Sequence, residues 1–233
     1  MAGRMELSLL GGFGLSVDGE VLPGLSTGSR RLLAFLALQG RLMPRAHVAG
    51  TLWSASSDDR AGSSLRSALG RLPGPARQAV RLTTHDVGLD GDVVVDFHRS
   101  YALAHRLSDQ DAPPGTTDVA ALSQDLLPNW YDDWVVIAAE DWRQLRVRAL
   151  EALAARLTAV DRLPEAKAAA LGAVRAEPLR ESARVALIRV HVAEGDEPEA
   201  VAAFERFRRL LQAELGLEPT PRITRLLRDF EPR

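Results

Sequence analysis

Residues 58–72, DDRAGSSLRSALGRL, combine arginine and serine at a spacing that suits contacts with a polyanion. On a helix of about 3.6 residues per turn, one face of this stretch would carry only arginine and serine side chains. Its members are Arg60, Ser63, Ser64, Arg66, Ser67 and Arg71. Guanidinium groups and hydroxyls on one open face suit contacts with the phosphates and base edges of a DNA major groove. Taken alone, the stretch is more typical of an ordinary amphipathic surface helix, and it is the surrounding sequence that favours the DNA-binding interpretation.

The opposite face of the same helix would be apolar and would anchor it in a protein core. Its members are Ala61, Leu65, Ala68, Leu69 and Leu72. Asp58 and Asp59 stand at the start, where carboxylates stabilise a helix N-terminus. Gly62 and Gly70 each weaken a helix by about 1 kcal/mol relative to alanine. We therefore expect this helix to order fully only against the protein core or on DNA.

Positive charge is concentrated around this stretch. The whole chain has a net charge of −2, yet residues 28–81 hold nine arginines and only two acids, a local charge of +7. Residues 101–233 carry 18 basic and 22 acidic residues. A local basic block is the electrostatic signature of a nucleic-acid binder, because neutralised phosphates release counterions.

Composition excludes several other classes of protein. Hydrophobic residues make up 46% of the 233-residue chain, which is typical of a globular protein with a sizeable core. The absence of cysteine excludes disulfides and thiolate metal sites. No apolar run approaches the roughly 20 residues of a membrane span, and the N-terminus lacks the apolar core of a signal peptide. We therefore expect a cytoplasmic protein without a membrane partner.

No arrangement of side chains predicts catalysis, a metal site or a cofactor. The five histidines are scattered, and no zinc-protease, nucleophile-elbow or Walker pattern occurs. The glycines of GGFG at 11–14 precede neither a Gly-Lys-Ser/Thr sequence nor an immediate helix. Asp132 and Asp133 are adjacent, so their side chains would diverge on a helix. The sequence thus predicts a protein that is not an enzyme and binds no cofactor.

The elements ahead of the basic helix are short strands and two helices. Residues 5–10 alternate as a strand, and Asp18-Gly19 predicts a hairpin between 15–17 and 20–22. A core helix is predicted over 30–40, with Thr27 or Ser29 as its N-cap and Gly40 at its end. Pro44 then opens a second helix over 45–53.

The elements behind the basic helix complete a winged helix-turn-helix. Pro73-Gly74-Pro75 ends the helix, and β-rich runs follow at 79–84 and 87–97. The alternation around Asp90-Gly91 predicts a closing hairpin with its turn at these two residues. In a winged helix the third helix enters the major groove while the hairpin lies along the DNA backbone.

The basic helix supplies our candidates for base reading, which are Arg66, Ser63 and Ser67. The candidates for phosphate contacts are Arg60, Arg71, Arg77 and Arg81.

From Phe97 onward the pattern is helical. Residues 108–118 form a polar, Pro/Gly-rich loop, and a long helix is predicted over 135–160. Residues 161–174 align with 195–208 at an offset of 34, the period of tetratricopeptide repeats, whose concave faces bind peptides or proteins. The dense aromatic cluster Trp130, Tyr131 and Trp134 predicts a packing anchor between layers, with a ligand pocket or partner surface as the alternative.

Several segments of the chain match the pattern of a known family. The N-terminal half carries MELSLLGGFGLSVDGEVL, RRLLAFLAL and TLWSASSDDRAGSSLRSALGRL. The C-terminal half carries LLPNWYDDWV and RAEPLRESARVALIRVHVAEGDEPEAVAAFERFRRLLQAELGLEPTP, of which ELGLEPTP is the most diagnostic part. With these segments the chain resembles the Streptomyces antibiotic regulatory proteins (SARP). The resemblance extends over residues 5–229 and departs from the family at Gly70, where relatives often have a bulky aromatic residue.

The resemblance implies a transcriptional activator that binds direct repeats in promoter DNA, as a side-by-side homodimer. It also implies contact with RNA polymerase, including its sigma factor. The connector between the second and third helices would face the polymerase. Its candidate contacts are Ser54, Ser56, Ser57, Asp58 and Asp59.

We therefore predict a mainly helical fold with a small β part. Residues 1–96 would form a winged-helix DNA-binding domain, and residues 97–233 an all-α bacterial transcriptional activator domain of tetratricopeptide type. The predicted function is a sequence-specific activator that recruits RNA polymerase. The alternative is an adaptor whose repeat domain binds a protein partner, with a degenerate winged helix that no longer reads DNA.

Overall fold

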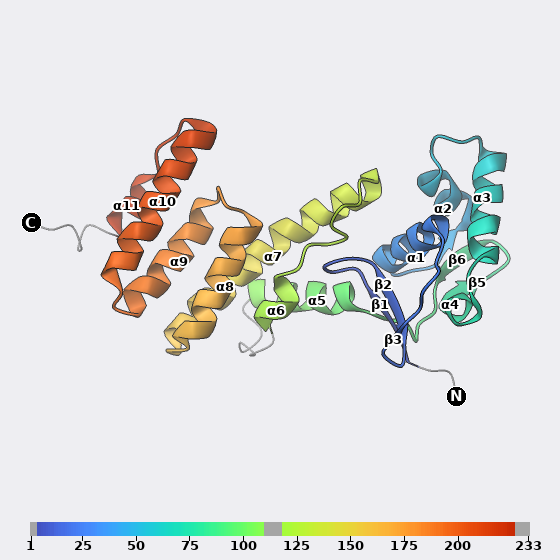
Figure 1. The fold of residues 1–233 in the computed structure, drawn as a ribbon, viewed down its shortest axis with the longest axis horizontal. Coiled ribbons are helices and arrows are strands. Elements are labelled where there is room, and N and C mark those ends of the chain that lie inside the picture. The colour runs from blue at the N-terminus through green and yellow to red at the C-terminus, as the bar shows by residue number, and fades with distance from the viewer. Residues whose placement is uncertain (1–3, 110–117, 227–233) are drawn as a thin grey trace, which may run out of the picture. The chain divides into compact units, whose positions relative to one another are not determined.

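The computed structural model describes residues 4–109 and 118–226 (Figure 1). The chain divides into two compact units. The first unit comprises Met1–Arg99 and Asp125–Glu140, and the second comprises Ser100–Gln124 and Asp141–Arg233. Residues 125–140 follow the predicted boundary in sequence but belong with the N-terminal unit. Most of the loop predicted over 108–118 lies outside the described residues.

The first unit contains two small sheets. In one, β1 (Met5–Ser8) pairs antiparallel with β2 (Gly14–Val17), which pairs with β3 (Glu20–Val21). Asp18 and Gly19 both have positive φ at the predicted turn between β2 and β3. In the other sheet, β6 (Asp86–Leu89) lies between β4 (Met43–Pro44) and β5 (Val80–Leu82).

Three helices that pack on one another contribute much of the core of this unit. Helix α1 (Thr27–Gln39) buries Leu32, Leu33 and Leu36 completely and contacts α3 (Asp58–Gly70). Helix α2 (Arg45–Leu52) packs on α3 as well. The predicted end of α1 at Gly40 is confirmed, since Gly40 has φ 60° and its N–H bonds the Leu36 carbonyl.

The predicted N-cap of α1 is wrong. The cap is Ser26, whose hydroxyl accepts a hydrogen bond from the Ser29 N–H at 3.1 Å. Thr27 is already the first helical residue, and the Ser29 hydroxyl donates instead to the Ala68 carbonyl on α3.

The predicted position of the closing hairpin is also wrong. The hairpin joins β5 to β6, and its turn is residues 83–85, where the Thr83 hydroxyl accepts from the Asp86 N–H at 2.9 Å. The strand after Asp90-Gly91, β7 (Val94–Val95), pairs in parallel with β1 in the other sheet. Both edges of β6 are occupied by β4 and β5, so β7 has no place beside it.

Asp96 joins the two ends of the winged-helix segment. Its carboxylate accepts from the N–H groups of Leu9 at 2.8 Å and Leu10 at 3.2 Å, just after β1. It also accepts from the Phe97 N–H at the start of α5 (Asp96–Ser108). Burial raises the pKa of Asp96 above its usual value, and these three backbone hydrogen bonds partly offset that rise.

Residues 125–140 complete the first unit by packing aromatic rings on it. Trp130 stacks on Phe13 at a centroid distance of 5.9 Å, and Trp134 meets the edge of Phe35 at 5.2 Å. The Leu127 N–H donates to the Leu9 carbonyl at 2.8 Å. This geometry favours the packing anchor that the aromatic cluster predicted, although the Tyr131 side chain remains 83% exposed.

The second unit is built from helices only in its described part. Helix α7 (Asp133–Ala159) continues into it from the first unit, and α6 (Asp118–Leu122) contacts α8 (Leu163–Ala176). The repeat helices follow as α8 (Leu163–Ala176), α9 (Glu181–Ala193), α10 (Glu197–Leu215) and α11 (Pro221–Arg225). Neighbouring helices from α8 to α10 pack side by side (Figure 1).

The repeat has the predicted period. Helices α8 and α10 begin 34 residues apart, at Leu163 and Glu197. Small residues lie at the helix contacts, as expected: Ala166 on α8 and Ala200 on α10 are completely buried, and a Cβ on Gly172 of α8 would lie 3.3 Å from Leu150 on α7. The predicted fold class, small sheets followed by a helical repeat unit, is confirmed. Within the two described ranges, no helix is long and apolar enough to cross a membrane.

We predict that Asp96→Ala destabilises the protein by about 2–4 kcal/mol, because it leaves the Leu9 and Leu10 N–H groups without their acceptor. Urea denaturation measures this free energy. The control is Asp92→Ala, an exposed carboxylate in the preceding turn, for which we expect a change within about 0.5 kcal/mol.

The cost of Asp96→Ala should also depend on pH. Because burial raises the pKa of Asp96 in the folded protein, the unfolded chain ionises this carboxyl first as the pH rises above 3.8. The stabilisation by Asp96 is therefore fully present below pH 3.8 and declines as the pH rises through the folded-state pKa. A cost that is larger at about pH 7 than at about pH 4 would contradict this prediction.

Candidate nucleic-acid interface

Helix α3 is anchored by its predicted apolar face. Ala61 and Leu65 are 1% and 3% exposed, and Ala68, Leu69 and Leu72 are also buried. The helix runs without a break through Gly62 to Gly70, packed against α1 and α2. Asp58 and Asp59 occupy its first turn, as predicted. Packing against the core therefore overcomes the low helix propensity of the two glycines.

The opposite face of α3 is open to solvent. Of its six predicted members, Arg60, Ser63, Arg66, Ser67 and Arg71 are exposed and Ser64 is half-buried. The structure thus brings all six to one polar helix face, which contains three guanidinium groups and three hydroxyls. We call these six residues the α3 polar face.

Two members of the α3 polar face are already connected by a hydrogen bond. The Arg66 Nη2 donates to the Ser63 hydroxyl at 2.7 Å, and that hydroxyl donates to the Asp59 carbonyl at 2.9 Å. The Arg66 side chain therefore lies back along the helix. A guanidinium has five N–H donors, so most of its hydrogen-bonding capacity remains available for an incoming partner.

A polar hollow of about 570 Å³ adjoins the α3 polar face. Its walls come from the N-terminus of α1 and from α3. The lining residues are Ser26, Thr27, Gly28, Trp53, Ser63, Ser64, Ser67, Ala68 and Arg71. Sequence reasoning missed the first four, because nothing in the sequence indicates that the start of α1 lies beside α3.

The Ser29 hydroxyl fixes how α3 sits on α1. Its hydroxyl donates to the Ala68 carbonyl at 2.9 Å, and Ser29 is completely buried. The Ala68 carbonyl belongs to the last turn of α3, where carbonyls have no partner within the helix. One buried hydrogen bond therefore ties the C-terminal end of the α3 polar face to the core helix.

The two remaining predicted phosphate contacts lie outside α3. Arg77 is exposed in the last turn of the short helix α4 (Gly74–Gln78), and Arg81 is exposed on β5. The hairpin turn beyond Arg81 is braced by Arg45, a residue that sequence analysis did not single out. The Arg45 Nη2 donates to the Thr83 carbonyl at 2.5 Å, and the backbone N–H of Arg45 donates to the His85 carbonyl at 2.9 Å.

The connector between α2 and α3 is exposed throughout. The predicted polymerase contacts Ser54, Ser56, Ser57, Asp58 and Asp59 all lie at the surface. The Ser56 N–H donates to the Trp53 carbonyl at 2.9 Å, which turns the chain just after α2. These side chains form an accessible acidic and hydroxyl-rich loop beside the α3 polar face.

One cluster in the second unit has the residue types of a metal site. His191, Glu194 and Asp196 offer ligand atoms within 4.8 Å of one another. The Lys167 ammonium lies 2.9 Å from a Glu194 carboxylate oxygen and neutralises it. A metal ion would have to displace or tolerate that ammonium, so this geometry favours an ion pair.

The strands, three helices and closing hairpin of the first unit define a winged helix-turn-helix protein, here joined to a helical repeat unit. Residues 95–229, more than half of the chain, match the family profile of the bacterial transcriptional activator domain. The chain therefore belongs to this family, which comprises regulators of transcription and is not a class of enzymes. This membership confirms the resemblance to the SARP regulators.

The fold is similar to that of a solved structure, Mycobacterium tuberculosis EmbR in complex with a low-affinity phosphopeptide. The TM-score is 0.68 at 22% sequence identity. The match covers 97% of this chain but only 64% of the EmbR chain, so the protein described here spans less than two thirds of the length of EmbR. The search of curated proteins gave no match.

We predict that Ser29→Ala lowers the free energy of unfolding by about 1–2 kcal/mol, because the Ala68 carbonyl loses its buried donor. Urea denaturation of the full chain measures the change. Ser8→Ala, which removes an exposed hydroxyl from β1, is the matched control and should change the free energy little. Equal stability of the Ser29→Ala variant and the wild type would mean that the Ala68 carbonyl finds water instead.

Proposed function

We propose that this protein is a transcriptional activator that binds promoter DNA through α3 and recruits RNA polymerase. The observation that carries the proposal is the α3 polar face, whose six members are all arginine or serine and five of them exposed, on a helix whose other face is buried. Family membership supports the coarser statement, a regulator of the SARP type. The DNA contacts and the polymerase contacts below are the finer parts of the proposal.

The dimensions of α3 suit the major groove. Its 13 residues make a rod of roughly 20 Å, and the major groove of B-DNA, about 12 Å wide, admits one helix. Winged helices place their third helix there and lay the hairpin on the adjacent backbone. In this protein that hairpin is β5 and β6, so Arg81 would face phosphates while α3 faces bases.

The roles divide by position on α3. Arg66, with Ser63 and Ser67, stands in the middle of the helix and is the proposed base-reading group, since arginine can make two hydrogen bonds to one guanine. The arginines nearer the helix ends and on the hairpin side would contact phosphates. They are Arg60, Arg71, Arg77 and Arg81.

The polar hollow beside α3 would seat one phosphate of the backbone. The N-terminus of α1 contributes backbone N–H groups and the hydroxyls of Ser26 and Thr27, and Arg71 contributes a cation. Helix N-termini favour anions because their first N–H groups lack partners and the helix dipole is positive there.

The connector of residues 54–59 would meet RNA polymerase, including its sigma factor, while α3 holds the DNA. The exposed carboxylates of Asp58 and Asp59 suit a basic patch on a protein partner better than they suit DNA. We further propose that two copies bind side by side on direct repeats, and that the protein acts in the cytoplasm, where promoter DNA is found.

A second candidate function is a protein-binding adaptor with a winged helix that does not read DNA. The net charge of −2 and the repeat unit favour it. A heparin or DNA column distinguishes the two hypotheses. An adaptor would elute at low salt, whereas the proposed activator would be retained until the salt concentration is high.

We predict that Arg66→Ala relaxes sequence preference, costing about 1–3 kcal/mol of discrimination, whereas Arg71→Ala weakens binding to all duplexes alike and reduces the salt slope by about 1. Fluorescence anisotropy measures both effects at two salt concentrations. The probes are duplexes from the promoter nearest the gene of this protein, and scrambled duplexes.

Arg99→Ala is the matched control for both variants, because Arg99 is exposed in the first unit but lies outside the basic block of residues 28–81. It should leave both affinities nearly unchanged. If Arg66→Ala keeps the wild-type sequence preference, the assigned division between base reading and phosphate contact is wrong. Equal, weak binding of the wild type to both duplexes would favour the adaptor.

We predict that the double variant Asp58→Asn and Asp59→Asn loses most transcriptional activation yet still binds the promoter duplex. Both substitutions keep the side-chain size and remove the charge that would face the polymerase. They also remove the favourable charge at the N-terminus of α3, at a cost of about 0.3–1 kcal/mol each, which the packed helix tolerates. Removing two negative charges beside the DNA should, if anything, tighten DNA binding. Transcription in vitro and anisotropy on the same preparation measure the two properties, and full activation by the variant would exclude this contact.

A further inference from the structure

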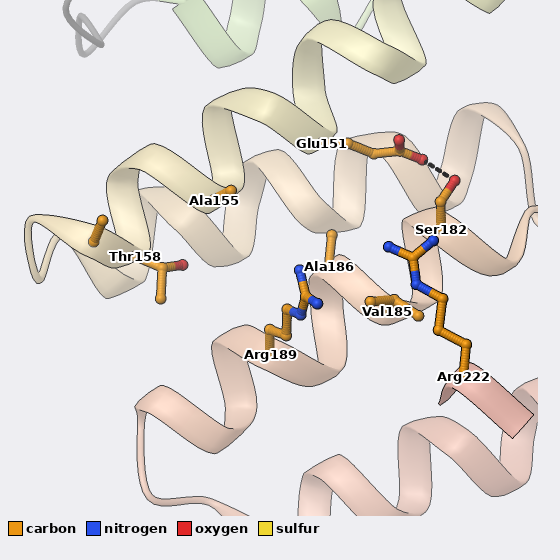
Figure 2. A pocket seen from close by; sticks show the side chains of 9 residues that line it. Glu151, Ala155, Thr158, Ser182, Val185, Ala186, Arg189 and Arg222 are labelled. Atoms are coloured by element: carbon orange, nitrogen blue, oxygen red, sulfur yellow. Dashed lines mark hydrogen bonds between the residues drawn. The ribbon is translucent and has the colours of Figure 1, made fainter. Parts of the chain in front are cut away.

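The second unit contains a groove that the proposed DNA-binding function does not use. It is a cavity of about 370 Å³ between α7, α9 and α11 (Figure 2). The lining residues are Glu151, Ala155, Thr158, Ala159, Ser182, Val185, Ala186, Arg189 and Arg222. All of them belong to the second unit, so the groove lies within one compact part of the chain.

The floor of the groove is made of small apolar side chains. Ala155 and Ala159 on α7 are exposed, Ala186 on α9 is half-buried, and Val185 below it is buried. Larger residues at these places would fill the space between the helices. The floor therefore leaves room for apolar side chains of a bound segment, which would lose water-accessible surface there.

Two cations reach into the same space. The guanidinium groups of Arg189 on α9 and Arg222 on α11 both point into the cavity (Figure 2). Both arginines are exposed, and in the described part of the chain no carboxylate pairs with either of them. They differ in this from Arg180 and Arg206, which pair with Glu151 and Glu199.

Among the described residues that line the groove, the only acid is Glu151, and its charge is already neutralised. Glu151 accepts from the Arg180 Nε at 3.1 Å and from the Ser182 hydroxyl at 2.7 Å (Figure 2). Its charge is thus balanced by a guanidinium that does not line the cavity. Arg189 and Arg222 leave the groove with a local positive charge, although the surrounding half of the chain is acidic.

The position of Arg222 is built into the fold. The Glu181 carboxylate, at the start of α9, accepts from the N–H and the hydroxyl of Thr220, which caps α11. Ile223, the residue after Arg222, is completely buried in a cluster with Phe207 and Ile188. These contacts hold α11 as one wall of the groove and aim Arg222 across it.

We propose that this groove binds a short acidic segment of a protein partner. Two carboxylates of the segment would meet Arg189 and Arg222, and apolar side chains between them would lie on Ala155 and Ala186. Guanidinium groups bind carboxylates with two parallel hydrogen bonds, which adds geometric selectivity to the charge attraction. A narrow groove with an apolar floor fits an extended peptide, whereas a DNA duplex needs a broad basic surface.

The test begins with selection of peptides on the intact protein. A phage library of random 12-residue peptides is selected on the full-length wild type and counter-selected on the double variant Arg189→Ala and Arg222→Ala. We expect enriched sequences that carry at least two acidic residues among apolar ones. No enrichment, or enrichment of sequences without acids, would overturn the proposal.

Enriched peptides are then synthesised with a fluorescein label and titrated by anisotropy. Loss of either guanidinium should weaken binding about tenfold, the usual effect of removing one charged hydrogen-bond partner. Arg189→Lys should bind the peptides more tightly than Arg189→Ala does. Peptides with asparagine in place of aspartate should bind the wild type as weakly as the original peptides bind the double variant. Arg175→Ala, which removes an exposed cation on α8 outside the groove, is the control.

The same variants are titrated with the promoter duplex. The proposal expects unchanged DNA binding by the double variant, so a failure of the α3 assignment would not affect this result. If the double variant loses affinity for the duplex, or if the duplex displaces the peptide, the groove belongs to a DNA path and the peptide proposal is wrong.

Discussion

The burial of the apolar face of α3 against α1 and α2 is the constraint on which the rest of the first unit depends. Once Ala61, Leu65 and Ala68 point inward, the helical period leaves the arginines and serines no position except the surface. The Ser29 hydroxyl fixes the C-terminal end of that packing through the Ala68 carbonyl. A helix with two glycines would be marginal alone, so its chemistry is available only because the core orders it.

Residues 125–140 extend this constraint to the other side of α1. They lie inside the family match of residues 95–229, yet they belong to the N-terminal unit. Phe35 of α1 meets Trp134, and backbone hydrogen bonds join residues 125–127 to Leu9 and Gly11. The helix that supports α3 is thus held between α3 and this aromatic segment. A fragment that ended at residue 96 would expose the face of α1 that Trp134 covers, so the first unit depends on sequence from the activator domain.

The sequence predicts best where one local period decides the outcome. The two faces of α3 follow from about 3.6 residues per turn, and the repeat helices follow from a period of 34 residues. Prediction fails where partners are distant in sequence. The chain does turn at Asp90-Gly91, as predicted, since the Val93 N–H donates to the Asp90 carbonyl. However, β4 and β5 occupy both edges of β6, so β7 pairs with β1 instead. The Ser26, Thr27 and Trp53 wall of the hollow beside α3 has no local signal at all.

Arginine is so frequent in this chain that its presence alone indicates little, and what distinguishes one arginine from another is its neighbours. The Arg45 guanidinium donates to the Thr83 carbonyl in the hairpin turn, and the Arg180 guanidinium forms an ion pair with Glu151. Arg66 donates only to the Ser63 hydroxyl, and neither Arg66 nor Arg189 forms a salt bridge with an acid in the described residues. A guanidinium that lies beside hydroxyls on an open helix, without an acidic partner, suits phosphates and base edges, whereas one above an alanine floor suits a carboxylate with apolar neighbours. The same side chain therefore supports two different partners on two parts of one chain, and the surroundings decide which.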